Sequence, residues 1–228
     1  MESFAHRLNQ APDPRGPFLD PDHFVFLADK MNDFDSETGR GTLAWARHRR
    51  KSRIAFEHMS WPFEAVASWE FPSVYPEPKS LPFEVSFVSD RTLRLRWRTR
   101  PGPIHEKESL MLAGPVPESR AWKGVLGKGE VLYSGPHGCI RVRLDPWGLD
   151  LEDAAGRLLT HTQHPKDSRC MIGSRPVPFS FVRMAGELDQ WMAASFRLSP
   201  GEKIIGCGES FTRLDKRGQT VRLWTQDP

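Results

Sequence analysis

The stretch Leu81-Pro-Phe-Glu-Val-Ser-Phe-Val-Ser-Asp-Arg-Thr-Leu-Arg-Leu-Arg-Trp-Arg98 decides the fold class. Apolar residues alternate with polar ones before the Ser89-Asp90-Arg91 sequence, and the alternation resumes after it. Successive side chains of a β-strand point to opposite faces, so a period of two marks a strand with one buried face. The stretch therefore predicts a hairpin of two antiparallel strands with one face in the core and one face in water.

The same period of two returns along much of the chain. Short apolar or alternating runs occupy residues 131–133, 140–144, 149–151, 158–160, 179–182, 192–198 and 203–205, with a last run at Val221 and Leu223. Many short strands separated by turns are typical of sandwiches and barrels. The one helix candidate, around residues 186–194, is too short for a fold in which helices alternate with strands. The predicted fold class is all-β.

The first part of the chain lacks this periodicity. Pro12, Pro14, Pro17 and Pro21 fall within it, and Gly39 and Gly41 close it. Proline removes a hydrogen-bond donor and restricts the residue before it, so we expect neither a long helix nor a central strand here. The predicted organisation is an irregular segment over residues 1–40, followed by a β-domain over residues 41–228.

Composition places the chain among ordinary globular proteins. It has 228 residues, of which 38% are hydrophobic and 27% charged. No apolar run approaches the roughly 18 residues of a membrane span, and no apolar stretch follows a basic start as in a secretory leader. Cys139, Cys170 and Cys207 are odd in number and widely spaced, which argues against a disulfide framework. We therefore expect no contact with a membrane and a location in the reducing cytoplasm.

Two arginine-rich stretches raise the question of a nucleic-acid partner. One runs from Arg47 to Arg53, and the other is the row Arg94, Arg96 and Arg98. Acidic residues lie nearby, and 32 Lys and Arg stand against 29 Asp and Glu in the whole chain. We therefore interpret both stretches as solvated strand faces or loops and expect no nucleic-acid partner, although a nucleic-acid-binding β-protein is an alternative.

Familiar catalytic and cofactor motifs are absent from the sequence. His161 and His164 have no Cys or carboxylate at a spacing that suits zinc, and Cys207 lies between two glycines without a neighbouring His. Neither a Gly-x-Ser-x-Gly elbow nor a phosphate-binding loop occurs. We expect no cofactor and no metal ion.

Aromatic residues offer an alternative function. Sugar rings stack on exposed aromatic faces, and the cluster of Trp61, Trp69, Phe71 and Tyr75 is either such a platform or part of the core. A free-standing carbohydrate-binding module that uses Trp61, Trp69 or Trp122 is therefore the second hypothesis.

The most specific signal lies at residues 201–227. An apolar pair, Ile204-Ile205, is followed by Gly206-Cys-Gly-Glu-Ser-Phe211, then by Lys216-Arg-Gly-Gln219, then by Trp224 and Asp227. This order resembles the end of the N-terminal β-domain of family 31 glycoside hydrolases, the α-glucosidase and α-xylosidase group. Cys207 departs from the family pattern, where a larger apolar residue is common, and Ser210 stands where Arg is common.

The resemblance implies an antiparallel β-sandwich of the galactose-mutarotase-like type, which packs against a following (β/α)₈ barrel. It also implies a β-loop-β excursion that reaches the active site of that barrel. Three residues on it are expected to bind substrate, and five are expected to shape the loop: Asp227, Trp224 and Phe211 in the first group; Gly206, Gly208, Glu209, Gly218 and Gln219 in the second. Hydrolysis in the family retains configuration and uses two carboxylates about 5–5.5 Å apart.

Both of those carboxylates lie in the barrel, which takes about 250 residues of its own. We therefore expect this chain to be the N-terminal portion of a longer enzyme and to be inactive alone. No acid of the chain matches the family's nucleophile or proton donor, and Asp145, Glu152 and Asp215 are interpreted as turn or surface carboxylates. The expected partners are its own catalytic barrel and an α-linked sugar, and a homo-oligomer is left open.

Overall fold

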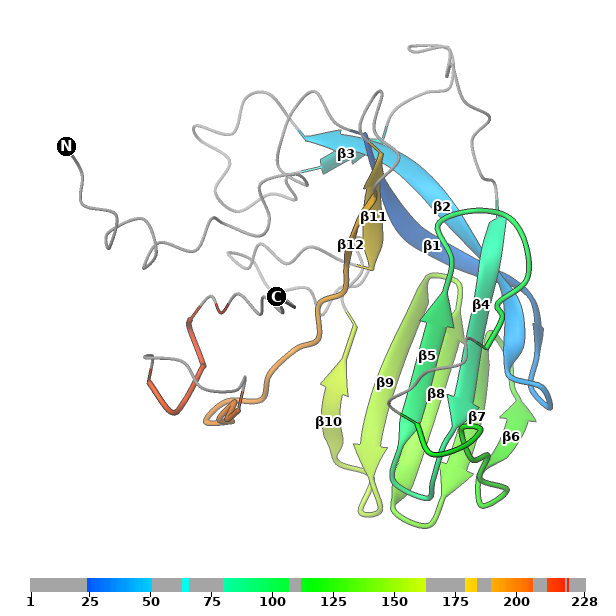
Figure 1. The fold of residues 1–228 in the computed structure, drawn as a ribbon, viewed down its shortest axis with the longest axis vertical. Helices are drawn as coiled ribbons and strands as arrows, with labels where there is room; N and C mark the ends of the chain where they lie inside the picture. Colours follow the sequence, from blue (N-terminus) through cyan, green and yellow to red (C-terminus); the bar gives the residue numbers. More distant parts are fainter. Residues whose placement is uncertain are drawn as a thin grey trace.

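The computed structural model describes residues 24–50, 63–65, 80–106, 112–162, 179–183, 190–206, 213–219 and 221. Every regular element in these ranges is a β-strand (Figure 1). The strands are β1 (Phe24–Asp35), β2 (Arg40–Arg50), β3 (Phe63–Ala65), β4 (Ser80–Phe87), β5 (Leu93–Trp97), β6 (Lys123–Leu126), β7 (Glu130–Gly135), β8 (Gly138–Leu144), β9 (Trp147–Asp153), β10 (Leu158–His161), β11 (Ser180–Arg183) and β12 (Gln190–Ala193).

The strands form two antiparallel sheets that pack as a sandwich. The larger sheet has the order β12-β11-β1-β2-β4-β5, with β3 also paired to β2, and the smaller one has the order β10-β9-β8-β7-β6. Aromatic contacts join the sheets: Phe83 of β4 meets Trp147 of β9 at 5.5 Å between ring centroids, and Phe87 meets Tyr133 of β7 at 5.1 Å. The all-β sandwich predicted from the sequence is confirmed.

The hairpin at residues 81–98 is confirmed as β4 and β5. Phe83 faces Trp97, Val85 faces Leu95 and Phe87 faces Leu93 across the pair. All six belong to the hydrophobic core or pack against it. Their polar neighbours occupy the outer face, as the period of two requires.

The prediction of an irregular segment over residues 1–40 is wrong from Phe24 onward. β1 is central, because it pairs with β11 on one side and with β2 on the other. The four prolines that suggested irregular structure all precede Phe24. Two register irregularities along β1, between Ala28 and Lys30 and between Asn32 and Asp35, break the alternation that marks a strand in sequence.

Three further predictions need correction. Residues 190–193 of the helix candidate form β12, paired with β11. The strand expected at 192–198 ends at Ala193, and Phe196 makes only an isolated bridge with Thr162. The run at 203–205 likewise contributes only a bridge between Ile205 and Asp215.

Arg47 was expected in solvent but is buried. It lies on the same face of β2 as Leu43 and Trp45, and its guanidinium sits 5.2 Å from the ring centroid of Phe24. β2 is an interior strand of the larger sheet, not an edge. The end of the same basic run, residues 51–53, falls outside the described residues, as do Cys170, Cys207 and the aromatic cluster of Trp61, Trp69, Phe71 and Tyr75.

Candidate functional site

The C-terminal motif begins on a small folded base, which we call the stem (residues 199–206 and 213–219). Its first limb opens with a turn in which the Glu202 amide donates to the Ser199 carbonyl at 3.2 Å. Its two limbs are joined by the Ile205–Asp215 bridge and by the Lys216 amide, which donates to the Ile204 carbonyl at 2.6 Å. The stem is therefore held by backbone contacts between residues on either side of the loop tip.

Asp215 and Arg217 fasten the two limbs of the stem. The Asp215 carboxylate accepts the amides of Arg217 at 3.0 Å and Ile204 at 3.2 Å. The Arg217 amide chiefly, and then the Ile204 amide, lower the pKa of Asp215 below its ordinary value. The Arg217 guanidinium donates to the carbonyls of Ser199 at 2.9 Å and Glu202 at 2.8 Å. Asp215 thus serves the turn, in agreement with its interpretation as a turn carboxylate.

The structure brings three of the predicted site residues into the stem. Gly206 and Gly218 have φ values of 124° and 72°, and no atom of the described residues lies within 4 Å of a Cβ built on either. Both glycines therefore serve backbone conformation and not close packing. Gln219 donates through Nε2 to the Asp215 carbonyl. The remaining predicted residues, Gly208, Glu209, Phe211, Trp224 and Asp227, lie outside the described residues.

An apolar groove of about 430 Å³ lies at the base of the stem. It runs between β10, at one edge of the smaller sheet, and the segment that leads into the stem. The Thr160 hydroxyl donates to the Arg197 carbonyl at 2.7 Å, and the Arg197 amide donates to the His161 carbonyl at 2.9 Å. Three exposed apolar side chains line the groove, namely Leu158, Leu159 and Leu198.

Sequence reasoning missed this groove, although one signal was present. Leu158 and Leu159 are adjacent on β10, so a strand must turn one of them away from the core. Both are in fact exposed, at 39% and 47%. The edge strand of the smaller sheet therefore presents apolar surface to solvent.

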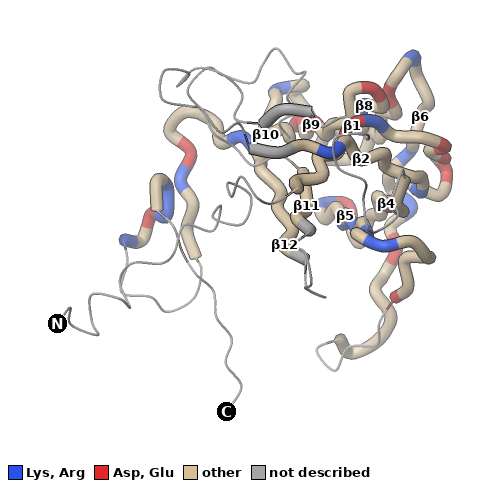
Figure 2. Tube along the Cα trace, turned by 90° about the horizontal axis from the view of Figure 1, so that it is seen from above, with Lys and Arg blue, Asp and Glu red and all other residues tan. Residues whose placement is uncertain are grey.

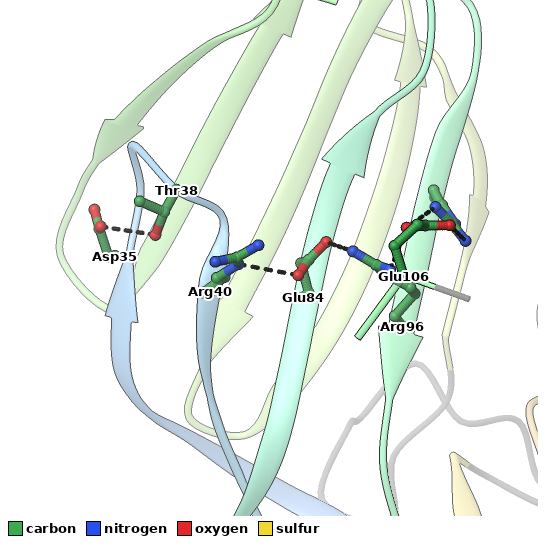
Figure 3. Close-up of polar contacts among 7 residues, drawn as sticks. Asp35, Thr38, Arg40, Glu84, Arg96 and Glu106 are labelled. Carbon is green, nitrogen blue, oxygen red and sulfur yellow. Dashed lines mark hydrogen bonds and ion pairs between the residues drawn. The ribbon is translucent and has the colours of Figure 1, made fainter. Parts of the chain in front are cut away.

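The arginine row of β5 is engaged in ion pairs, as Figure 3 shows. Arg94 holds Glu106 through two hydrogen bonds of 2.9 Å, and Arg96 bonds both Glu106, at 2.6 Å, and Glu84. Glu84, whose side chain is only 5% exposed, also accepts from Arg40 at 3.0 Å. Hydrogen bonding to Arg94 lowers the pKa of Glu106 below its usual value.

These pairs weigh against the nucleic-acid alternative. A phosphate-binding stripe needs cations that are free to meet phosphates, whereas Arg94 and Arg96 already hold carboxylates. Figure 2 shows basic and acidic positions interspersed along the described part of the chain.

Trp122 does not offer a free stacking face. Its indole stacks on Phe87 with centroids 4.6 Å apart and planes 12° apart, and its Nε1 donates to the Ser89 carbonyl at 3.1 Å. Gly135 packs so closely that a Cβ there would lie 2.6 Å from the indole. The carbohydrate-binding alternative therefore loses Trp122 as a platform, while Trp61 and Trp69 lie outside the described residues.

Neither a metal-ligating cluster nor a membrane-spanning helix occurs among the described residues. No group of three His, Cys, Asp or Glu residues in these ranges is placed to hold a metal ion. No helix in the same ranges is long and apolar enough to cross a membrane. His161 is buried, with Nδ1 2.9 Å from the Thr162 carbonyl oxygen, and Cys139 is a half-buried free thiol.

The solved structures to which the chain is similar include two crystal structures of the uncharacterized protein lmo2446 from Listeria monocytogenes EGD-e. The first, in complex with α-D-glucose, β-D-glucose, magnesium and calcium, is 14% identical over 70% of this chain, with a TM-score of 0.36. The second is 12% identical over 63% of this chain, with a TM-score of 0.33. In both comparisons the chain covers only 10% of the length of the Listeria protein.

No curated protein matches the chain. A family model does match it, described as the glycosyl hydrolase 31 N-terminal galactose mutarotase-like domain, over residues 82–228. The match covers most of the chain, including β4 from residue 82 onward, all of β5 and the whole C-terminal motif. The chain therefore belongs to the family of glycosyl hydrolase 31 N-terminal galactose mutarotase-like domains.

Proposed function

We propose that this chain is the N-terminal portion of a retaining α-glycosidase of the α-xylosidase or α-glucosidase type. The observation that carries the proposal is the family match over residues 82–228, which includes the motif of residues 201–227. In this role the sandwich supports a catalytic barrel and supplies one loop to its sugar pocket. The two catalytic carboxylates belong to the barrel, so the chain alone has no hydrolytic activity.

The stem supports this division of labour. A loop that contacts substrate must be held in one place by the scaffold that carries it. Asp215 and Arg217 fix the stem through four hydrogen bonds to backbone groups of residues 199–217. In this proposal the substrate contacts come from Phe211, Trp224 and Asp227 of the same motif.

The apolar groove beside the stem is the proposed contact with the barrel. Leu159 and Leu198 are 47% and 37% exposed there, and removing them from water favours association by about 25 cal/mol per Å² of apolar surface. The groove and the stem share Ser199, so a barrel seated on the groove also meets the loop.

Activity of the complete reading frame tests the proposal. We expect hydrolysis of aryl α-xylosides or α-glucosides with retention of configuration. Proton NMR of the released sugar measures its anomeric configuration. Asp227→Ala should lower kcat/KM strongly and leave the thermal midpoint unchanged, because its carboxylate is assigned to the substrate. Asp90→Ala, an exposed acid in the β4–β5 turn, is the matched control. Normal kinetics in a folded Asp227→Ala enzyme would exclude the assigned role.

Self-association of the 228-residue chain tests the groove separately. With the groove uncovered, we expect concentration-dependent association in sedimentation velocity, and Leu159→Lys should abolish it. Lys128→Ala, on the exposed turn at the opposite edge of the sheet, should leave it unchanged. A strictly monomeric wild-type chain would argue against an interface at this position.

A further inference from the structure

A second pocket lies at the opposite edge of the smaller sheet. It has a volume of about 480 Å³, within the range of about 300–1,000 Å³ that ligand sites occupy. The β1–β2 turn, the segment leading into β6 and the end of β4 enclose it. β6 and β10 are the two edges of the smaller sheet, so this pocket is remote from the stem and its groove (Figure 1).

The walls of this pocket are fixed by contacts between the two sheets. The Tyr133 hydroxyl donates to the Ser36 carbonyl at 3.0 Å, and the Ser119 amide donates to the Phe87 carbonyl at 2.7 Å. A Cβ on Gly124 would lie 2.7 Å from the Ser36 carbonyl oxygen, so β6 touches the β1–β2 turn directly. The pocket is therefore formed before any ligand arrives, and a ligand binds without ordering the chain.

Hydroxyl groups inside the pocket present complementary hydrogen-bonding functions. The exposed Thr38 hydroxyl donates its proton to Asp35 at 2.7 Å, so its oxygen offers lone pairs to a ligand. Ser119 accepts the Ala121 amide at 3.3 Å, and its own proton is available. A ligand that fits must therefore both donate and accept hydrogen bonds.

Four charged side chains at the rim determine which net charge of a ligand the pocket accepts. Glu37 and Glu118 are acidic, whereas Arg120 and Lys123 are basic, so the rim has no net charge. Within the part of the chain that the structure describes, none of the four is engaged in an ion pair. A phosphate or carboxylate ligand would require an excess of cations, and an apolar ligand would require an uncharged rim.

We propose that this pocket is an accessory binding site for a neutral sugar, separate from the catalytic pocket to which the loop contributes. Hydroxyls of the sugar exchange hydrogen bonds with Thr38, Ser119 and the rim charges, while the half-buried Trp122, which also lines the pocket, supplies apolar surface for its C–H groups. The choice of a sugar among neutral polyhydroxylated ligands rests on the proposed function.

Titration of the isotopically labelled 228-residue chain with maltose tests the site. We expect saturable shifts of the Gly39, Ser119 and Gly124 amide signals that are insensitive to sodium chloride, because the ligand is neutral. Lys123→Ala and Glu118→Ala should each weaken binding about tenfold, the effect of losing one hydrogen bond to a charged group. Lys128→Ala and Asp90→Ala, exposed residues outside the pocket, should bind maltose as the wild type does.

The possible results separate this site from the proposed function. Shifts confined to the stem, absence of saturable shifts, or equal response to sodium phosphate or glucuronate would each overturn the accessory site. None of these bears on hydrolysis by the complete reading frame. Conversely, maltose binding at Gly124 in a protein whose complete form hydrolyses no α-glycoside would leave the pocket standing and remove the proposed function.

Discussion

Replacing Gly39 with Ala tests whether the contact of the β1–β2 turn with β4 holds the sandwich together. Gly39 has φ of 67°, and a Cβ there would lie 2.1 Å from the Val85 carbonyl oxygen. The left-handed conformation alone costs Ala about 1 kcal/mol. The turn must also withdraw from β4, which breaks the 2.8 Å bond from the Val85 amide to the Gly39 carbonyl. The Tyr133–Ser36 bond weakens with it, and each bond contributes about 1 kcal/mol.

The expected loss for Gly39→Ala is therefore about 3 kcal/mol in the free energy of unfolding, measured by urea denaturation. In a domain of this size this lowers the thermal midpoint by about 6–12 °C. Two control variants separate the cost of the backbone conformation from the cost of the close contact with Val85. Gly129, with φ of 80° and no atom from the described part of the chain within 4 Å of a Cβ, isolates the backbone cost, so Gly129→Ala should lose about 1 kcal/mol. Gly114→Ala, at a position where no described atom lies within 4 Å of a Cβ, should lose nothing or gain slightly.

Equal losses for Gly39→Ala and Gly129→Ala would refute this reasoning. That result would mean that the close approach to Val85 costs nothing, and that the turn can move away from β4 without consequence. The walls of the accessory pocket would then not be fixed, because the same turn forms one of them.

Three further predictions concern single side chains. Glu84→Gln should destabilise the chain by about 3 kcal/mol in urea, because it breaks a buried pair, whereas Glu106→Gln at the exposed end of the same network should leave the denaturation midpoint unchanged. Burial raises the pKa of Tyr133 to about 12, so ultraviolet titration should show one of the two tyrosines ionising near that pH. The folded chain should lose stability as the pH rises from 10 toward that value. Tyr133→Phe should remove the ionisation at high pH. Because the pKa of Asp215 is lowered, its carboxylate stabilises the stem above pH 3.8, and this contribution disappears as the pH falls below that value. Asp215→Asn should speed hydrogen exchange of the Ile204 and Arg217 amides already at neutral pH. Unchanged exchange would contradict the assigned contacts.

The sequence predicted best those strands that have one buried and one wet face. β4, β5 and β8 alternate cleanly because each carries core side chains on one face and paired charges on the other. β1 was missed for the opposite reason: its first half is a continuous buried run, Val25 to Ala28, and its second half is irregular in register. A fully buried run has no period of two, so periodicity alone does not reveal it.

Of the two candidate sites, the sequence predicted one and did not predict the other. The stem was within reach of the sequence because its residues are close in the chain and form a family motif. The accessory pocket was not, since its walls come from residues 36–39, 85–87 and 118–124, which meet only when the two sheets pack. Hydrogen bonds such as Tyr133 to Ser36 follow from that packing and have no counterpart in local sequence.

The position of β1 has a consequence for synthesis on the ribosome. One of its neighbours, β2, follows directly in the chain, whereas the other, β11, emerges only after the entire smaller sheet has been made. Until Ser180–Arg183 leaves the exit tunnel, β1 presents an open row of amides and carbonyls to any nascent chain beside it. Crowded polysomes translating this message should therefore be the place where misassembly begins, and a chaperone that shields an unpaired strand would act during that interval.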